Sequence, residues 1–201
     1  MTTISELSPG AFIDVEPAFL SRGEADEALA RLTAEIDWRQ EDVVFFGKRV
    51  PQPRLSLWMG DAGARYTYSG VAREPAPWHP QVRELGDRAA RIAGVRFDSA
   101  LLNLYRDGRD SMGLHADDEP ELGPEPIIAS LSLGATRRFT LRPKQKRDPA
   151  RVELALEHGS LIVMRGLLQA HWVHGVPKQL RVTAPRINVT YRAIVHGREA
   201  P

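Results

Sequence analysis

The residues best suited to metal chemistry lie in the segment MGLHADDEP, where one residue separates His115 from Asp117. In an extended chain this spacing places both side chains on the same face, so they can share one metal ion. An HxD pair alone is a weak signal, because such pairs also occur on protein surfaces. The chain contains no cysteine, which excludes disulfides, thiolate zinc sites, iron–sulfur clusters and a cysteine nucleophile. Any metal ion must therefore be held by His, Asp or Glu.

A third ligand is expected among the other histidines, at positions 79, 158, 171, 174 and 196. His171 and His174 follow the apolar segment SLIVM (160–164), and a β-fold can return this part of the chain to the HxD pair. One of the two, with His115 and Asp117, would form a facial triad. Such a triad leaves adjacent positions of an octahedral Fe(II) open for a chelating co-substrate and O2. The residue types alone do not choose between the two histidines.

The segment RINVTYR (186–192) carries two arginines on one face of an expected strand. Its polar face consists of Arg186, Asn188, Thr190 and Arg192, and its apolar face of Ile187, Val189 and Tyr191. One interpretation is a polar face turned to solvent. The other is an inward-facing anion site, where a guanidinium makes two charge-assisted hydrogen bonds to the far carboxylate of a co-substrate. Asn103 and Tyr105 share a face of their own segment, LLNLY, and can hydrogen-bond the same ligand.

Mostly short strands are expected to position these residues. The chain has 201 residues, 42% of them hydrophobic, which suits one domain with a sizeable core. A capping box at Ser21 and Glu24 predicts a helix over about 22–37, and a second helix is predicted from Pro80 to Gly94. Between them, residues 42–78 predict short strands and loops. Period-two segments predict strands at 99–105, 127–133, 137–142, 151–157, 160–164 and 186–192. This pattern favours a β-sandwich or barrel with the two helices covering one face.

Charge and hydropathy narrow the classes of partner. The formal net charge is +1, so the chain has no bulk polycation character. Between residues 137 and 151 the chain carries only one acidic residue, Asp148, and a basic cluster. The cluster consists of Arg137, Arg138, Arg142, Lys144, Lys146, Arg147 and Arg151. It is either a positive edge for phosphates or a solvated loop. No apolar run approaches the roughly 18 residues of a membrane span, and the first ten residues do not resemble a signal peptide. We therefore expect a cytoplasmic monomer without a membrane partner.

Four segments in order resemble the motifs of the AlkB family of Fe(II)- and 2-oxoglutarate-dependent dioxygenases. They are NLYRDGRDSMGLHADDEPELGPEPIIASLSLG, HGSLIVM, HWVHGVP and APRINVTYR, and the resemblance covers about residues 40–193. It implies a mainly β fold with flanking helices and a double-stranded β-helix (jelly-roll) core. Within a single domain of residues 1–201, it implies N-terminal helices and a nucleotide-recognition lid over about 1–97 and a catalytic core over about 98–193. The implied cofactors are Fe(II), 2-oxoglutarate as co-substrate, and O2.

The resemblance also assigns the site residues. His115, Asp117 and His174 match the iron ligands, because His174 directly precedes the segment GVP, as the last ligand does in the family. His171 would then either support the metal ligands or be a structural residue. The positions around 2-oxoglutarate match Asn103, Tyr105, Arg186, Asn188, Thr190 and Arg192. Of the two arginines, Arg192 is interpreted as the partner of the distal carboxylate and Arg186 as flanking the iron side.

Further segments resemble the family branch that repairs alkylated bases in single- and double-stranded DNA. They are FFGK (45–48), GDAGARYTYSG (60–70), PW (77–78) and the acidic pair Asp118 and Glu119. The resemblance implies that Phe45 or Phe46 acts as a wedge at a hairpin tip, and that Tyr66 and Tyr68, with Trp58, line a base pocket. Asp118 or Glu119 would meet the exocyclic amino group of the base. Ordinary core packing of the phenylalanines and a solvated Glu119 are the alternatives.

The expected activity is oxidative dealkylation of bases such as 1-methyladenine and 3-methylcytosine in DNA. In this reaction 2-oxoglutarate becomes succinate and CO2, and the alkyl group leaves as formaldehyde. One rival is an oxygenase of the same fold that acts on RNA, protein or a small molecule. A more remote rival is a cupin-like metal-binding module without turnover. The joint presence of HxD, a downstream histidine and RxNxTxR favours the enzyme.

Overall fold

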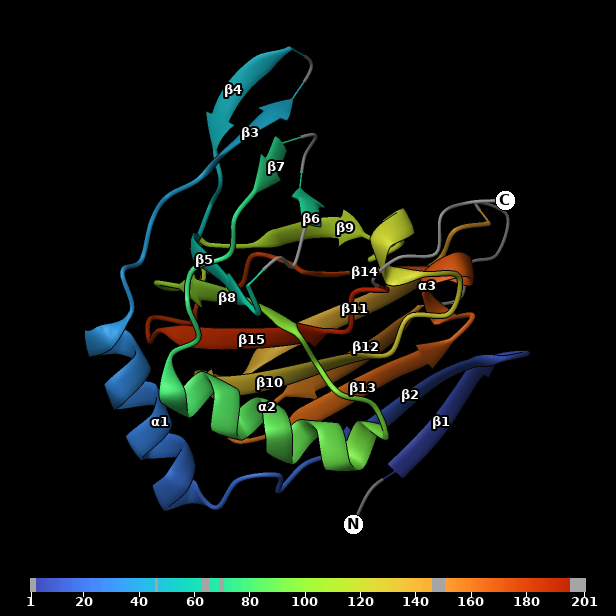
Figure 1. The fold of residues 1–201 in the computed structure, drawn as a ribbon, viewed down its shortest axis with the longest axis horizontal. Coiled ribbons are helices and arrows are strands. Elements are labelled where there is room, and N and C mark those ends of the chain that lie inside the picture. The colour runs from blue at the N-terminus through green and yellow to red at the C-terminus, as the bar shows by residue number, and fades with distance from the viewer. Residues whose placement is uncertain (1–2, 46, 63–65, 69–70, 146–150, 196–201) are drawn as a thin grey trace.

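The computed structural model describes residues 3–45, 47–62, 66–68, 71–145 and 151–195 (Figure 1). In chain order its elements are β1 (Thr3–Ser8), β2 (Ala11–Glu16), α1 (Arg22–Glu35), β3 (Asp42–Phe45), β4 (Lys48–Pro51), β5 (Leu55–Gly60), β6 (Tyr66–Tyr68), β7 (Val71–Arg73), α2 (Pro80–Ala93), β8 (Ser99–Tyr105), β9 (Met112–His115), the 3-10 turn η1 (Pro120–Leu122), β10 (Ile128–Gly134), β11 (Arg137–Pro143), β12 (Val152–Leu156), β13 (Leu161–Gly166), α3 (Leu168–His171), β14 (Trp172–Val176) and β15 (Arg186–Arg192). None of the helices in the described part of the chain is long and apolar enough to cross a membrane.

Two antiparallel sheets face each other and form a jelly roll. The larger sheet has the strand order β1-β2-β13-β10-β15-β8-β5, and the smaller has the order β12-β11-β14-β9. Two separate hairpins, β3–β4 and β6–β7, project at the top of the view in Figure 1, above β9. The mainly β, jelly-roll fold expected from the sequence is confirmed, and all six predicted strands are present as β8, β10, β11, β12, β13 and β15.

Helices α1 and α2 cover the outer face of the larger sheet (Figure 1). Both form where the sequence predicts them. At the start of α1 the capping box is complete, with Ser21 and Glu24 each bonding the other's backbone N–H. At the end of α2 Gly94 adopts φ 73°, a left-handed conformation that favours glycine. One apolar core lies between the helices and the larger sheet, and a second lies between the two sheets.

Strand β15 lies in the interior of the larger sheet, between β10 and β8 (Figure 1). All seven of its residues are buried. Ile187, Val189 and Tyr191 belong to the core beneath the helices. Because side chains alternate along a strand, Arg186 and Arg192 point to the opposite side, between the two sheets. The solvent-facing interpretation of the arginine strand is therefore wrong.

The first 97 residues contribute three strands to the larger sheet. β2 pairs with β13, β1 pairs with β2, and β5 pairs with β8. The sequence did not predict strands before residue 21. Their charged and polar side chains are accommodated because β1 is an edge strand, and because Asp14 of β2 forms an ion pair with Arg165 of β13.

α2 and β15 pack so closely at Gly86 that one added methyl group should destabilise the fold. A Cβ built on Gly86 would lie 2.8 Å from Cε1 of Tyr191, whose hydroxyl donates to the carbonyl of Val82 at 2.8 Å. Gly86→Ala should therefore lower the free energy of unfolding by about 1–3 kcal/mol through overpacking. Gly23→Ala in α1 is the matched control, since nothing lies within 4 Å of its Cβ, and it should raise that free energy by up to about 1 kcal/mol. Urea unfolding measures both, and equal effects of the two would contradict the packing argument.

Candidate metal and co-substrate site

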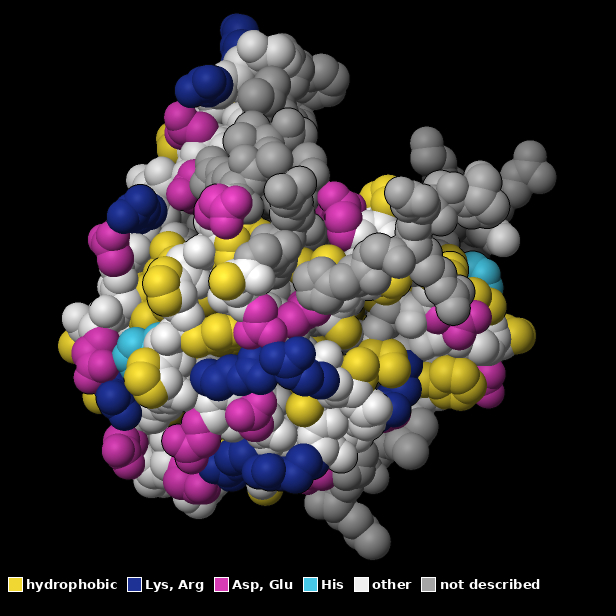
Figure 2. All heavy atoms as spheres, in the orientation of Figure 1, with side chains coloured by type: hydrophobic (Ala, Val, Ile, Leu, Met, Phe, Trp, Pro, Cys, Tyr) yellow, Lys and Arg dark blue, Asp and Glu magenta, His cyan; other side chains and the backbone are white. Residues whose placement is uncertain are grey.

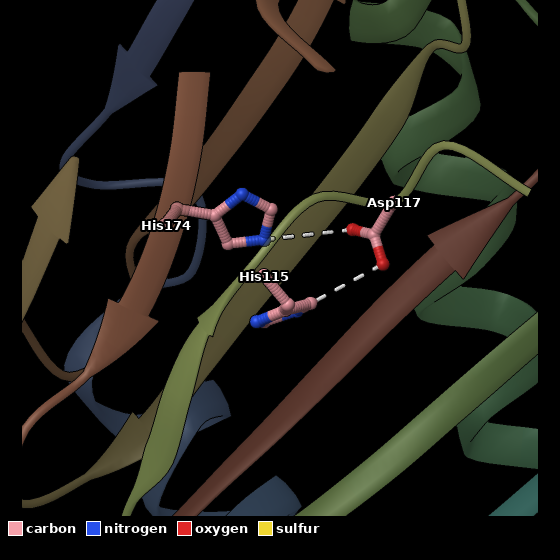
Figure 3. A group of neighbouring side chains, drawn as sticks. All are labelled: His115, Asp117 and His174. Carbon is pink, nitrogen blue, oxygen red and sulfur yellow. Dashed lines mark ion pairs between the residues drawn. The ribbon is translucent and has the colours of Figure 1, made fainter. Parts of the chain in front are cut away.

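Three side chains from the smaller sheet converge on one point between the sheets (Figure 3). His115 ends β9, Asp117 follows it by two residues, and His174 lies in β14. β9 and β14 are paired with His174 opposite His115, which brings the two imidazoles together. Nε2 of His115 lies 4.0 Å and Nε2 of His174 lies 3.6 Å from carboxylate oxygens of Asp117. The three ligand atoms all lie within 4.8 Å of one another, so a single ion can contact all of them.

The protonation states suit a divalent cation. Nδ1 of His115 lies 2.9 Å from the carbonyl of Gly113, and because a carbonyl only accepts, Nδ1 donates and Nε2 is the nitrogen that faces the other two ligands. Burial, together with the nearby His115, lowers the pKa of His174 to about 3, so its imidazole is neutral at pH 7. Burial disfavours the charged form of Asp117, but Arg192, His174 and His115 together outweigh it and lower the pKa of that carboxyl. Two imidazoles and one carboxylate are the donor set of a facial triad for Fe(II).

His171 does not belong to this group. It is exposed at the end of α3, and its backbone carbonyl accepts a hydrogen bond from the N–H of Lys144 at 2.8 Å. Because α3 ends and β14 begins at the next residue, the chain turns between the two histidines, and only His174 points between the sheets. The structure thus brings together the three residues that the family motifs assigned to the metal.

A cavity opens beside the triad and is lined by both sheets. Besides the triad, its walls consist of Leu101, Asn103, Tyr105, Met112, Ser130, Phe139, Met164, Gly175, Val176, Asn188, Thr190 and Arg192. Five of the six side chains expected around 2-oxoglutarate line it directly. The sixth, Arg186, lies behind Tyr105, with its guanidinium carbon 5.3 Å from the centroid of that ring. The registers of β15 with β8 explain this arrangement, since Arg186 is opposite Tyr105 and Asn188 is opposite Asn103.

The two arginines lie at opposite ends of β15. Nη2 of Arg192 lies 2.6 Å from Oδ1 of Asp117, which places this arginine at the metal end. Arg186 is 1% exposed and donates from Nη2 to the hydroxyl of Ser132 at 2.9 Å. Its Nε and Nη1 have no hydrogen-bond partner among the described residues. The geometry therefore favours the reverse of the division expected from the sequence, with Arg192 beside the metal site and Arg186 toward the distal carboxylate.

A buried guanidinium with unused donors is a site for an anion, because burying such groups without partners costs free energy. Burial, together with the nearby charge of Arg137, lowers the pKa of Arg186 to about 10. The side chain still carries its charge at neutral pH. The wall of the cavity at Tyr105, with Arg186 packed against that ring, is thus suited to a carboxylate.

Polar contacts fix the amides on the cavity wall. Nδ2 of Asn188 donates to the hydroxyl of Ser130 at 2.7 Å and to the carbonyl of Leu131 at 3.0 Å. Oδ1 of Asn103 accepts from Nε of Arg54 at 2.8 Å. Since its oxygen is already engaged, Asn103 can use its NH2 group toward a ligand.

A model of the 2OG-Fe(II) oxygenase superfamily matches residues 13–192 of the chain. The protein belongs to this superfamily. It is 43% identical over 186 residues to the human alpha-ketoglutarate-dependent dioxygenase alkB homolog 3, covering 89% of this chain and 64% of the relative. It is 40% identical over 183 residues to the human DNA oxidative demethylase ALKBH2, covering 87% and 70% respectively. The expected AlkB membership is confirmed. The chain spans less than two thirds of the length of the alkB homolog 3 relatives, which it covers to 62–64%.

The solved structure of OsALKBH1 has the same fold as this chain. It superposes with a TM-score of 0.64 at 17% sequence identity and covers 94% of this chain and 99% of that chain. At this identity the likeness concerns the fold alone.

Only some of the residues expected to contact the substrate lie in the described part of the chain. The predicted hairpin ahead of the second helix is confirmed as β3–β4, but Phe46 and the side chains of Phe45, Tyr66 and Tyr68 lie outside the described residues. Trp58 is partly buried against Leu122 and Ile194. Asp118 is exposed and pairs with Nζ of Lys144 at 2.8 Å. Glu119 is partly buried, and its Oε2 has no hydrogen-bond partner among the described residues.

The basic cluster around residue 140 is less exposed than its composition indicated. Arg137 is 1% exposed and bonds the backbone carbonyls of three residues, Asp107, Asp110 and Pro177. Arg138 and Arg151 both pair with Glu153, and Lys146 and Arg147 lie outside the described residues. Arg137 is thus a buried structural residue and does not contribute to a basic surface for phosphates.

The face over α2 also balances its charges. Figure 2 shows Lys and Arg side chains gathered there, with Asp and Glu side chains beside them. Arg83 pairs with Asp61 and Asp87, and Arg88 pairs with Glu24. These pairs leave less positive charge available to an anionic partner on this face.

Four residues that shape the site were not expected from the sequence: Arg54, Ser130, Ser132 and Gln169. The two serines had a recognisable signal, because the alternation in IIASLSL places both on one face of β10, and β10 pairs with the arginine strand. Arg54 directly precedes β5 and Gln169 lies in α3. No spacing in the sequence singles out either of these polar residues.

Proposed function

We propose that the protein is an Fe(II)- and 2-oxoglutarate-dependent dioxygenase that removes N-alkyl groups from bases in DNA, with lesions such as 1-methyladenine and 3-methylcytosine as substrates. The observation that carries the proposal is the cavity lined by the triad of His115, Asp117 and His174 and by Tyr105, with the buried guanidinium of Arg186 packed against the ring of Tyr105. A cavity with a divalent-metal site at one end and a carboxylate site at the other fits a 2-oxo dicarboxylate that chelates the metal.

The triad, Tyr105 and the two arginines have separate roles in the proposed reaction. His115, Asp117 and His174 would hold Fe(II), which when bound activates O2 and allows the oxidation of an N-alkyl carbon. Arg192 holds Asp117, while Tyr105 and Arg186 would hold the distal carboxylate of 2-oxoglutarate. Burial of the cavity excludes water and orients the co-substrate. The balance is one 2-oxoglutarate, one O2 and one N-methyl base giving succinate, CO2, formaldehyde and the unmodified base.

DNA is the proposed substrate because relatives with the printed name DNA oxidative demethylase share 34–41% identity with this chain. A base reaches the metal only after leaving the stack, and we assign the lid for it to about residues 1–97, which include the two projecting hairpins. Of the acidic pair, Glu119 is the better partner for the exocyclic amino group, because Asp118 is already paired with Lys144 and Oε2 of Glu119 is buried without a partner among the described residues.

The test is a screen of methylated oligonucleotides. Purified protein with Fe(II), ascorbate and 2-oxoglutarate should release formaldehyde from DNA that contains 1-methyladenine or 3-methylcytosine, together with one succinate per methyl group. Unmethylated strands of the same sequence are the control, and single and double strands are compared. Release from methylated RNA alone would favour the RNA rival. Absence of both products from every nucleic acid would reject the proposal.

A further inference from the structure

Gln169 lies beside the triad without lining the cavity. It belongs to α3, directly before β14, and is 1% exposed. Its Oε1 accepts a hydrogen bond from the backbone N–H of Asp117 at 3.0 Å, and its Nε2 lies 3.5 Å from Sδ of Met164. A buried amide whose oxygen accepts a hydrogen bond from a backbone N–H holds that backbone group in place.

The backbone of Asp117 needs such a partner. β9 ends at His115, and residues 116–119 form neither strand nor helix, so the sheet does not hold the main chain at this residue. Arg192 holds the carboxylate at 2.6 Å, and Gln169 holds the main chain. With both ends fixed, the side chain of Asp117 is aimed at the two imidazoles.

The segment that carries Gln169 also carries the third ligand. His174 follows Gln169 by five residues, and β14 pairs with β9 at His174 and His115. One continuous stretch, α3 and β14, therefore supplies one ligand, aligns a second by strand pairing, and holds the third by a side-chain amide. We infer that Gln169 is a positioning residue of the metal site, which sets the main chain of Asp117 for coordination. The inference rests on the proposed function only for the metal-binding role of the triad.

The test measures metal affinity rather than turnover. Gln169→Met keeps the length of the side chain and removes the acceptor, while Gln169→Asn keeps an amide one methylene too short to reach. Metal-free proteins are titrated with Co(II), and its visible absorption bands are followed. Both variants should bind Co(II) about 10–100-fold more weakly than the wild type, as is usual when a partner of a metal ligand is lost. Their bands should also differ in intensity, because the carboxylate is no longer held in one orientation.

The matched control is Gln179→Met. Oε1 of Gln179 accepts hydrogen bonds from the backbone N–H of Arg138 at 2.7 Å and from Nε of Arg137 at 3.4 Å, so a bond of the same kind, and a weaker one, are lost away from the cavity. This variant should bind Co(II) as the wild type does. If the control loses as much affinity as the Gln169 variants, or if they bind like the wild type with unchanged bands, the inference is wrong. If Gln169→Met does not fold, Gln169→Asn decides by the same measurement.

The Co(II) titration and the oligonucleotide screen can fail independently of each other. A wild-type protein that binds Co(II) but dealkylates no oligonucleotide would reject the proposed activity and leave the role of Gln169 standing. A wild-type protein that binds no Co(II) would reject the metal site and this inference with it.

Discussion

Replacing His174 by alanine should abolish dealkylation, whereas His171→Ala should leave it near the wild-type level. His174 is 4% exposed and offers a ligand atom within 4.8 Å of those of His115 and Asp117, while His171 is exposed on α3. Loss of a ligand should exceed the roughly 10–100-fold effect of losing a ligand's outer partner, so kcat/KM should fall by more than about 100-fold. Formaldehyde release from methylated DNA measures the activity.

The two histidines control for each other, since they are three residues apart in one segment. Circular dichroism and a thermal unfolding curve show whether each variant is folded. If His171→Ala were the inactive variant and His174→Ala retained turnover, the assignment of the third ligand would be overturned. A Co(II) titration of both variants should agree with the activities, because only His174→Ala removes a ligand atom.

This pair shows where sequence reasoning reaches its limit. Composition and spacing predicted that a histidine after SLIVM would return to the HxD pair, but they did not choose between two candidates. The choice came from the segment GVP that follows His174, through the resemblance to a family. In the structure the reason is local: α3 ends at His171 and β14 begins at the next residue, so the direction of the side chains changes between the two histidines.

The sequence predicted which residues share a face of a strand, but not which of them lies nearer the metal site. Alternation in RINVTYR sorted its residues into two faces, and the HxD segment indicated which face was turned inward. Alternation carries no information on which arginine lies nearer the metal, because Arg186 and Arg192 share a face. The register of β15 with β8 decides this, since it places Arg186 opposite Tyr105 and Arg192 opposite Ser99. Registers depend on pairing between distant segments, which a single strand's pattern does not specify.

Contacts made by single polar side chains were also beyond the sequence. Gln169 and Arg54 are bonded to residues 52 and 49 positions away, and no periodicity links such pairs. The strands β1 and β2 were missed for a related reason, because β1 lies at the edge of the sheet and a buried Asp14 in β2 is paired with Arg165.

Arg186→Ala should weaken the apparent affinity for 2-oxoglutarate by roughly 30-fold or more, the equivalent of about 2 kcal/mol. The guanidinium is buried, keeps its charge because its pKa of about 10 lies above assay pH, and has two nitrogens without a partner among the described residues. Removing it would leave the distal carboxylate of the co-substrate buried without a counter-charge. Arg186→Lys should be intermediate, because it keeps the charge but loses the fork that binds a carboxylate at two points. The apparent KM for 2-oxoglutarate in the dealkylation assay measures the effect.

A second co-substrate separates this role from general damage to the fold. 2-Oxobutyrate keeps the chelating 2-oxo acid group and lacks the distal carboxylate, so the wild type should strongly prefer 2-oxoglutarate. In Arg186→Ala that preference should largely disappear, because the partner of the missing carboxylate is gone. Arg31→Ala, on the exposed face of α1 and paired with Glu35, should keep the wild-type preference. If Arg192→Ala erased the preference and Arg186→Ala kept it, the division first read from the sequence would be right, and the bond between Arg192 and Asp117 would need another explanation.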